Sequence, residues 1–316
     1  MLRIKEHFGA IKVINFHAIT DGHWFEKIIE YLKTHKRIVS CDELDAYLKG
    51  QISIKNGYLL TVDDGERSFY DIMYPIIKKH QVPIAIFVSP KITTQEENFW
   101  FQEIAGFDHG KFKKICGEIL QIPLQSFEEI KVLALIKSMQ IHDVLEAIAT
   151  YKSKYNVADK TFQNVTVSEL KELHSSGLVT IGAHTMRHPI LLNETDEQSN
   201  YEIRNSVDDL SDLLNTQVKY FAYPNGIPAI DYNQREVEIL KDTGIVLSFS
   251  TNFTKVCKSS KPFEIPRGEI SNGQFDFRKK LALWQYWNQI SNIKNKRKDH
   301  LNQRKTMLAL IHQHHA

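Results

Sequence analysis

The sequence predicts an α/β fold built around a parallel sheet. Short apolar segments alternate along the chain with longer segments of helical spacing, which is the pattern of successive β-α units. One such segment, residues 82–89 (VPIAIFVS), is apolar almost throughout, as in a parallel strand buried on both faces. The chain of 316 residues, 42% hydrophobic and 25% charged, has the composition of a globular protein with a sizeable core.

The first part of the chain is predicted to contain three strands and two helices. The strands are expected at residues 10–17, 57–64 and 82–89. In the first helix, residues 24–36, four apolar residues recur at helical spacing: Phe25, Ile28, Ile29 and Leu32. The second helix, residues 68–80, should be kinked or restarted at Pro75, because proline cannot donate the backbone hydrogen bond of a helix interior.

The alternation resumes after residue 165. A helix is expected at 166–177, where Thr166 and Glu169 have the spacing of a capping box and Gly177 provides a stop. The following pattern predicts strands at 178–185, 218–224 and 245–250, and helices at 194–215 and 231–244. This order suits an irregular β/α barrel and also an open doubly wound sheet, and spacing alone does not distinguish them.

Two regions depart from this rhythm. Residues 91–165 are predicted to be a helical insertion carried on a main domain that spans residues 1–275. Residues 276–316 are predicted to form a C-terminal helix and a basic tail. We expect the tail to be solvated, and a flexible tail or a weak anchor for anionic lipid at the membrane surface are the alternatives.

Polar clusters fall at the predicted ends of three strands: Asp63-Asp64-Gly65, His184 to Pro189, and Tyr223 to Gly226. Each cluster taken singly suits an ordinary turn or surface loop. However, parallel α/β folds bind their ligands at the carboxyl ends of the strands. Two imidazoles and one carboxylate can hold a divalent cation, and the second carboxylate is then free to accept a proton.

These clusters carry a family resemblance. Thr61-Val62-Asp63-Asp64-Gly65 is similar to the motif T-F-D-D-G, and His184-Thr185-Met186-Arg187-His188-Pro189 matches H-[ST]-x-x-H-P in full. Residues 222–226 (AYPNG) match the third motif, R-x-P-Y, in part. From about Val13 to Arg267 the chain therefore resembles the polysaccharide deacetylase family, the NodB-homology group or carbohydrate esterase family 4.

The resemblance implies a fold, a reaction and a set of roles. The fold would be a distorted β/α barrel, and the reaction would be the metal-assisted hydrolysis of an N-acetyl group on an amino sugar of a polysaccharide or its biosynthetic intermediate. Asp63 would be the catalytic base, and the metal, most often Zn²⁺ in the family, would be held by Asp64, His184 and His188. The backbone N–H of Asn225 would stabilise the oxyanion. His17 and Tyr223 are predicted to bind the carbohydrate; for His17, proton donation and a purely structural role are the alternatives.

Three departures from the family pattern matter, of which the first, Val62 in place of phenylalanine, is a conservative core change. Ala222 stands where the third motif has an arginine that holds the catalytic aspartate. Arg267, after a late strand-like segment, is predicted to supply that guanidinium, and an ordinary surface arginine is the alternative. The general-acid histidine of the fifth motif, L-x-H, has its only literal match at 310–312 in the tail. We do not accept that match, which leaves the general acid unassigned.

Other readings of the sequence are weighed against this one. A deformylase or other amidase could use the same metal platform, and a catalytically degenerate carbohydrate-binding protein could keep the fold. Nucleic-acid binding is not expected, since the net charge is only +2 and the basic residues gather in the tail. The three distant cysteines predict no disulfide scaffold, and the absence of a signal-peptide pattern predicts a cytoplasmic protein.

Overall fold

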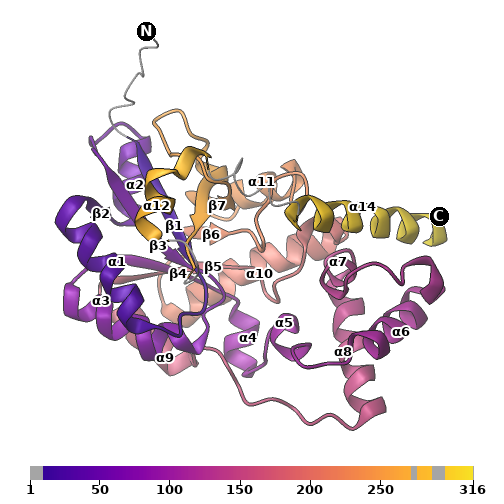
Figure 1. Cartoon of the computed structure of the whole chain (residues 1–316). Helices are drawn as coiled ribbons and strands as arrows, with labels where there is room; N and C mark the ends of the chain where they lie inside the picture. The colour runs from indigo at the N-terminus through magenta and orange to yellow at the C-terminus, as the bar shows by residue number, and fades with distance from the viewer. Residues whose placement is uncertain (1–9, 272–275, 287–295, 316) are drawn as a thin grey trace.

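Seven parallel strands close into a barrel in the computed structural model, which describes residues 10–271, 276–286 and 296–315 (Figure 1). The barrel strands are β1 (Ile11–Phe16), β3 (Gly57–Val62), β4 (Ile84–Val88), β5 (Val179–Ala183), β6 (Tyr220–Ala222), β7 (Leu247–Thr251) and β8 (Ile265–Glu269). Closure comes from β1, which pairs with β8 on one side and with β3 on the other. The barrel prediction is confirmed, and the open doubly wound sheet is excluded.

The barrel is irregular because its strands pair over unequal lengths. β1 and β3 pair along their whole length, whereas β5 and β6 share a single pair, Ala183 with Phe221. An eighth strand, β2 (Arg37–Val39), adds only to the first residues of β3, outside the closed ring. The sequence analysis missed β2 and the helix that follows it, α2 (Cys41–Leu48), because three strand residues and eight helical residues give little periodicity.

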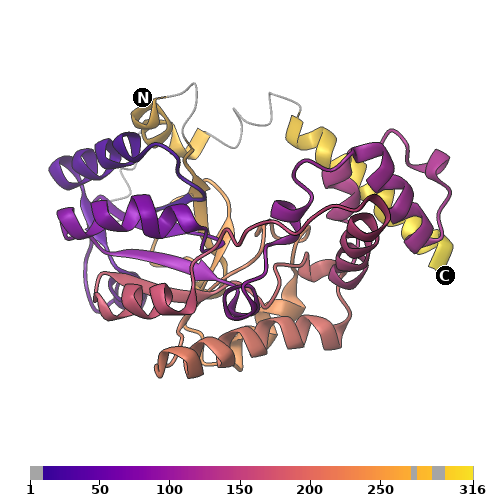
Figure 2. The ribbon, with the colours of Figure 1, turned by 90° about the horizontal axis from the view of Figure 1, so that it is seen from below.

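Helices cover the outside of the barrel, as Figures 1 and 2 show. They are α1 (Gly22–His35), α3 (Tyr74–His80), α9 (Val167–Ser175), α10 (Asp196–Leu214) and α11 (Gln234–Lys241), besides α2. Along β4, Ile84 and Ile86 pack towards these helices, and Ala85 and Phe87 belong to the core inside the barrel. Alternation of this kind explains why a strand buried on both faces is apolar at every position.

Local signals in the sequence define the helix ends as expected. A π-helical turn (Phe69–Met73) leads into α3, and Pro75 lies in the first turn of that helix, where its missing N–H costs no hydrogen bond. At the start of α9, the Thr166 side chain accepts from the N–H of Glu169, whose carboxylate accepts from the N–H of Thr166. This capping box satisfies two backbone donors that the helix cannot satisfy itself.

The predicted insertion forms a helical unit with its own apolar core. It contains α4 (Pro90–Gln95), α5 (Trp100–Glu103), α6 (His109–Leu120), α7 (Val132–Ile136) and α8 (Ile141–Tyr155). Phe112, Ile115, Leu135 and Tyr151 are buried in this core, which is separate from the two cores of the barrel. In Figure 2 the unit lies beside the barrel rather than around it.

The C-terminal helix is not simply solvated, contrary to expectation. The helix α14 (Lys296–His315) lies against the insertion helices in Figure 2, and Met307 is fully buried in the insertion core. Arg304 forms a buried ion pair with Asp231, at 2.7 Å, in the loop that follows β6. Because α14 buries an apolar side chain and a paired charge, it is part of the folded unit. A shorter helix, α12 (Phe277–Ala282), precedes it in the chain.

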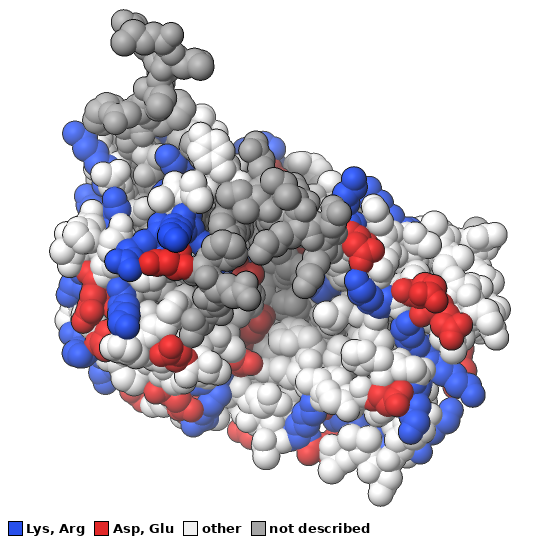
Figure 3. All heavy atoms as spheres, in the orientation of Figure 1, with Lys and Arg blue, Asp and Glu red and all other residues white. Residues whose placement is uncertain are grey.

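The surface gives little guidance about partners. On the face shown in Figure 3, basic and acidic side chains are interspersed among the described residues. Residues 287–295 lie outside the described part of the chain, so the proposed contact of the basic tail with anionic lipid remains a prediction. Within the described ranges, no helix combines the length and the apolar character required to cross a bilayer.

Glu194 connects the insertion to the barrel and makes stability depend on pH. Its carboxylate is buried and accepts a hydrogen bond, at 2.7 Å, from the N–H of Ile141 at the start of α8. Burial raises the pKa of Glu194 from 4.5 to about 7. A carboxyl group whose pKa is raised by folding stabilises the folded state fully at pH values below its pKa in the unfolded chain. This contribution is lost as the pH rises through its pKa in the folded protein.

Glu194→Gln should therefore stabilise the protein relative to wild type by an amount that grows between pH 4.5 and 7. The amide keeps an acceptor for Ile141 and cannot ionise. The gain should approach roughly 3 kcal/mol above pH 7, and denaturant titrations at pH 4.5 and 8 would measure it. A difference between the two proteins that does not vary with pH would contradict the prediction.

Candidate active site

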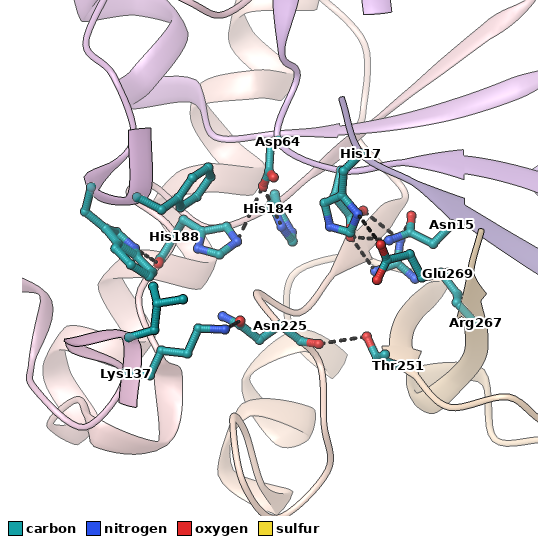
Figure 4. A pocket seen from close by; sticks show the side chains of 14 residues that line it. Asn15, His17, Asp64, Lys137, His184, His188, Asn225, Thr251, Arg267 and Glu269 are labelled. Carbon is teal, nitrogen blue, oxygen red and sulfur yellow. Dashed lines mark hydrogen bonds and ion pairs between the residues drawn. The ribbon is translucent and has the colours of Figure 1, made fainter. Parts of the chain in front are cut away.

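The carboxyl ends of the barrel strands open into a cavity of about 360 Å³ (Figure 4). The barrel provides most of its wall, and the insertion provides the side that carries Trp100, Phe101, Leu133 and Lys137. The remaining lining residues are Asn15, His17, Asp63, Asp64, His184, His188, Asn225, Thr251, Arg267 and Glu269. All the predicted site residues except Tyr223 therefore face one cavity.

Three predicted metal ligands converge in this cavity. The Oδ1 atom of Asp64 lies 3.5 Å from His184 Nε2 and 3.4 Å from His188 Nε2, and the three candidate ligand atoms lie within 4.8 Å of one another. Asp64 follows β3, whereas both histidines belong to the loop after β5. Burial lowers the pKa of His188 to about 4, which leaves that imidazole neutral and able to offer a lone pair.

Hydrogen bonds orient the first of the two histidines. The Nδ1 atom of His184 lies 2.7 Å from the carbonyl oxygen of Ala222, so Nδ1 donates a hydrogen bond to that carbonyl, and Nε2 lies on the side of Asp64, where a cation could bind both. Ala222, which replaces the arginine of the third motif, thus contributes its backbone to the site. Thr185 ties the loop together, because its hydroxyl donates to the carbonyl of His184 and accepts from the N–H of His188 at 2.9 Å.

The chain around the cavity is held in unusual backbone conformations. Asp64, Thr185, His188 and Asn225 have φ values of 73°, 63°, 59° and 57°, in the left-handed region that side chains other than glycine seldom adopt. A Cβ atom at Gly65, where φ is 68°, would lie 2.7 Å from Val88 Cγ1. Strained residues of this kind cluster at functional sites, where the surrounding structure enforces them.

Asp63 is held by an arginine and an asparagine. Arg267 donates to both carboxylate oxygens of Asp63, at 2.7 and 2.9 Å, and the side-chain amide of Asn15 donates a third bond at 2.9 Å. Burial would raise the pKa of Asp63, but Arg267 and His184 outweigh it and hold that pKa below its ordinary value. Asp63 is therefore ionised and fixed in orientation near neutral pH.

Arg267 lies inside the barrel rather than on the surface. Its side chain is 1% exposed, and its guanidinium lies over the neighbouring rings of Phe87 and Phe249, at 5.4 and 5.7 Å from their centroids. The alternative of an ordinary surface arginine is thereby excluded. An arginine on β8 thus contacts the aspartate that a third-motif arginine would have held.

An aromatic wall encloses His188 on the insertion side. The indole N–H of Trp100 donates to the carbonyl of His188 at 3.0 Å, and the rings of Phe99 and Phe101 meet the imidazole edge to face. The sequence analysis assigned no role to the aromatic segment 98–104. It lies at the cavity because the insertion folds back over the carboxyl ends of the strands.

Asn225 and Lys137 meet at the cavity, across from Asp64 in Figure 4. The ammonium group of Lys137, at the end of α7, donates to the side-chain oxygen of Asn225. Burial lowers the pKa of Lys137, as expected for a lysine withdrawn from water. Within the described part of the chain, the backbone N–H of Asn225 has no acceptor, so it is available to a ligand.

The two residues predicted to bind the carbohydrate, His17 and Tyr223, lie in different surroundings. His17, just after β1, is about half exposed and faces the cavity, with Nδ1 3.9 Å from Glu269. The prediction that Tyr223 binds substrate is wrong: its side chain is fully buried, stacks on Tyr232 and donates to the carbonyl of Phe263. The backbone turn after β6 directs Asn225, and not Tyr223, towards the cavity.

Several residues of the site were missed. Asn15 contacts Asp63, Lys137 contacts Asn225, and Glu269 lies beside His17. Asn15 gave a usable signal, because it is a polar residue between the apolar residues Ile14 and Phe16 of a predicted strand and precedes His17 by two positions. Lys137 gave none, since a lysine in a helical region is ordinarily solvated. In the tail, His312 is exposed and lines a separate cavity, which agrees with setting that match aside.

The site fits a divalent cation. Among the described residues, Asp64 Oδ1 is buried without a hydrogen-bond partner, although two imidazole nitrogens face it. A buried carboxylate oxygen without a partner is costly, and a cation bound by Asp64, His184 and His188 would satisfy it. Two nitrogens and one oxygen are a common donor set for Zn²⁺ with an open coordination position.

Glu202 supports the loop between the two histidines. It is fully buried in α10 and accepts hydrogen bonds from the N–H groups of Met186 and Arg187, at 2.9 and 3.0 Å. Glu202→Ala should weaken the affinity for Zn²⁺ by about 10- to 100-fold, because loss of a group that orients metal ligands has effects of this size. Glu202→Gln, which keeps an acceptor oxygen, is the matched control and should lose much less.

Competition with a chromogenic chelator would measure the affinity of the three proteins. Equal affinities in wild type and the alanine variant, with both proteins folded by circular dichroism, would contradict this role of Glu202.

The fold and this cluster together define a β/α-barrel protein with a candidate metal site at the carboxyl ends of its strands. Residues 53–248, more than half of the chain, match the polysaccharide deacetylase family, and the chain belongs to that family. The expectation drawn from the two sequence motifs is confirmed.

Known relatives agree with this assignment. The chain is 22% identical to the poly-beta-1,6-N-acetyl-D-glucosamine N-deacetylase of Staphylococcus aureus (strain MSSA476) over 272 residues, which cover 85% of this chain and 73% of that protein. Among solved structures, it resembles the Streptococcus pyogenes deacetylase PplD in complex with acetate (TM-score 0.57, 18% identity, 83% and 93% covered). It also resembles IcaB from Ammonifex degensii (TM-score 0.57, 19% identity, 88% and 97% covered). At these identities the structural matches establish the fold alone.

Proposed function

We propose that this chain is a metal-dependent N-deacetylase that hydrolyses the acetamide of an amino sugar in a polysaccharide or its biosynthetic intermediate. The observation that carries the proposal is the pairing of two adjacent carboxylates with different surroundings. Asp64 faces two imidazoles, and Asp63 faces an arginine. One carboxylate is thereby equipped to bind a cation, and the other to accept a proton.

The cation, to be tested first as Zn²⁺, would be held by Asp64, His184 and His188. When bound, it would act as a Lewis acid that polarises the acyl carbonyl and acidifies water. Proton transfer, orientation and charge stabilisation come from residues of the chain.

Asp63 serves as the general base in this proposal. Its two oxygens receive three hydrogen bonds, from Arg267 and Asn15, out of about four that a carboxylate can accept. One acceptor position is left for a water molecule in the cavity. As that water attacks the acyl carbon, Asp63 removes its proton.

Asn225 and His17 complete the reaction. The N–H of Asn225 can donate to the oxyanion that forms on the acyl oxygen. The leaving nitrogen needs a proton, and we assign its delivery to His17, the one imidazole at the cavity among the described residues that is not part of the candidate metal cluster. A protonated imidazole can donate a proton to the nitrogen as the C–N bond breaks. The products are acetate and the free amine.

The relatives indicate the substrate class. The curated proteins are described as deacetylases of poly-beta-1,6-N-acetyl-D-glucosamine. We propose an N-acetylglucosamine polymer or oligomer for this chain. Trp100 and Phe101 supply apolar surface in the cavity, of the kind on which sugar rings can pack.

The two alternative functions are less well supported. The case for a degenerate carbohydrate-binding protein depended on the missing third-motif arginine, and it weakens because Arg267 contacts Asp63. A deformylase or other amidase would use the same proton acceptor, but no feature of the cavity favours a formyl group.

The test is acetate release from N-acetylated glycans. Wild type should release acetate from β-1,6-linked N-acetylglucosamine oligomers, should stop in the presence of a chelator, and should recover when Zn²⁺ is restored. Chitin oligomers and the N-formylated analogue would separate linkage and acyl preference. Glycan binding without acetate release under all metal conditions would contradict the proposal and favour the binding protein.

A further inference from the structure

The loop that carries Asn225 is held from three directions. On the barrel side, the hydroxyl of Thr251 in β7 donates to the carbonyl of Asn225 at 2.7 Å. The N–H of Thr251 also donates to the carbonyl of Gly226 at 2.7 Å. These two bonds hold the backbone of Asn225 and Gly226 against β7. The side chain of Asn225 and the rest of the loop are held by other elements.

The C-terminal helix holds the far end of the same loop. Arg304 of α14 donates to Asp231 at 2.7 Å and to the carbonyl of Ile230 at 3.1 Å. Asp231 in turn accepts from the N–H of Ile227 at 2.9 Å. Since Arg304 and Asp231 are both buried, this ion pair is shielded from solvent and constrains residues 227–231 strongly.

The insertion holds the residue at the cavity itself. Lys137 follows α7, and its ammonium group donates to the side-chain oxygen of Asn225. The carbonyl of Lys137 accepts from the side-chain amide of Asn193 at 3.0 Å, which ties the same residue to the segment after the histidine loop. Lys137 therefore connects the insertion to both active-site loops.

From these contacts we infer that Lys137 is a positioning residue that holds Asn225 in its left-handed conformation and aims its N–H into the cavity. The inference rests on the proposed function for its catalytic consequence, but not for the structural contact. The left-handed region is uncommon for residues with a side chain, although asparagine tolerates it better than most, so a hydrogen bond to the side chain can help to select it at Asn225. The hydrogen bond from Lys137 is of this kind, and it comes from an element outside the barrel.

The experiment is a double-mutant cycle on Lys137 and Asn225. Lys137→Met should lower kcat on the β-1,6-linked N-acetylglucosamine oligomer by about 10- to 100-fold with little change in KM, since misplacing a group by about 1 Å has effects of this size. In the Asn225→Ala background, which lacks the side-chain oxygen, the same substitution should have little further effect. Lys131→Met, which removes an exposed lysine of the same segment, is the matched control and should keep the wild-type kcat.

Hydrogen exchange supplies a measurement that needs no activity. Amide exchange in a peptide spanning residues 223–230 should be faster in Lys137→Met than in wild type, and unchanged in Lys131→Met. A kcat loss that persists in full in the Asn225→Ala background, a change in KM alone, or unchanged exchange would each overturn the inference. If wild type is inactive on every glycan, the proposed function fails, and the exchange measurement still decides whether Lys137 holds the loop.

Discussion

Asp63→Asn is expected to lower kcat by about 1,000-fold or more, because it removes the proton acceptor and general base catalysis contributes effects of this order. The asparagine has nearly the same shape and keeps an oxygen for the hydrogen bonds of Arg267. Metal content should stay near the wild-type value, since the three ligands that we assign do not include Asp63. Acetate release and metal analysis of the same preparation would measure both effects.

Asp64→Asn is the matched comparison, because it makes the same chemical change at the neighbouring residue. It should lose most of the bound Zn²⁺, and its activity should recover in part when Zn²⁺ is raised. Asp63→Asn should not respond to added metal. If both variants lose metal to the same extent, the assignment of one aspartate to the cation and the other to the proton is wrong.

The positions of the site residues along the strands were the most predictable part of the site. Asp63, Asp64 and His184 each follow an apolar strand segment, and in a parallel fold the ends of such strands lie on the same side of the sheet. Two short motifs therefore sufficed to predict that residues about 120 positions apart would meet. Arg267 could be included by the same reasoning, because it belongs to a late strand.

Closure of the barrel could not be predicted from spacing. It depends on the pairing of β1 with both β3 and β8, and pairing partners are not encoded in the periodicity of one strand. The family resemblance, and not the pattern of apolar residues, favoured the barrel. β2 was missed for a related reason, since its three residues pair only with the first three residues of β3.

Side-chain direction was a second limit. Tyr223 and Asn225 are two residues apart in a loop, where no regular alternation relates the direction of one side chain to the next. Tyr223 enters the core and stacks on Tyr232, whereas Asn225 turns to the cavity through its positive φ. Lys137 was beyond prediction because its role depends on how the insertion packs against the barrel.

Arg267→Lys is expected to lower kcat by about 100-fold with little change in metal content. Arg267 holds both oxygens of Asp63 with two separate N–H groups, and a lysine offers one point charge that cannot reproduce this planar pairing. The lysine also lacks the flat guanidinium surface that lies over the rings of Phe87 and Phe249. A carboxylate that rotates would present its free acceptor position to the water only part of the time, which lowers the rate at saturating substrate.

Arg267→Met tests the same pair through stability. Removing the guanidinium leaves Asp63 as a buried carboxylate without its charged partner, which should destabilise the protein by about 3–5 kcal/mol. The double variant Asp63→Asn/Arg267→Met carries neither charge, so it should recover most of this stability while remaining inactive. Denaturant titration of the three variants and wild type measures the difference. If Arg267→Met is as stable and as active as wild type, Asp63 does not depend on Arg267, and its orientation must come from Asn15 alone.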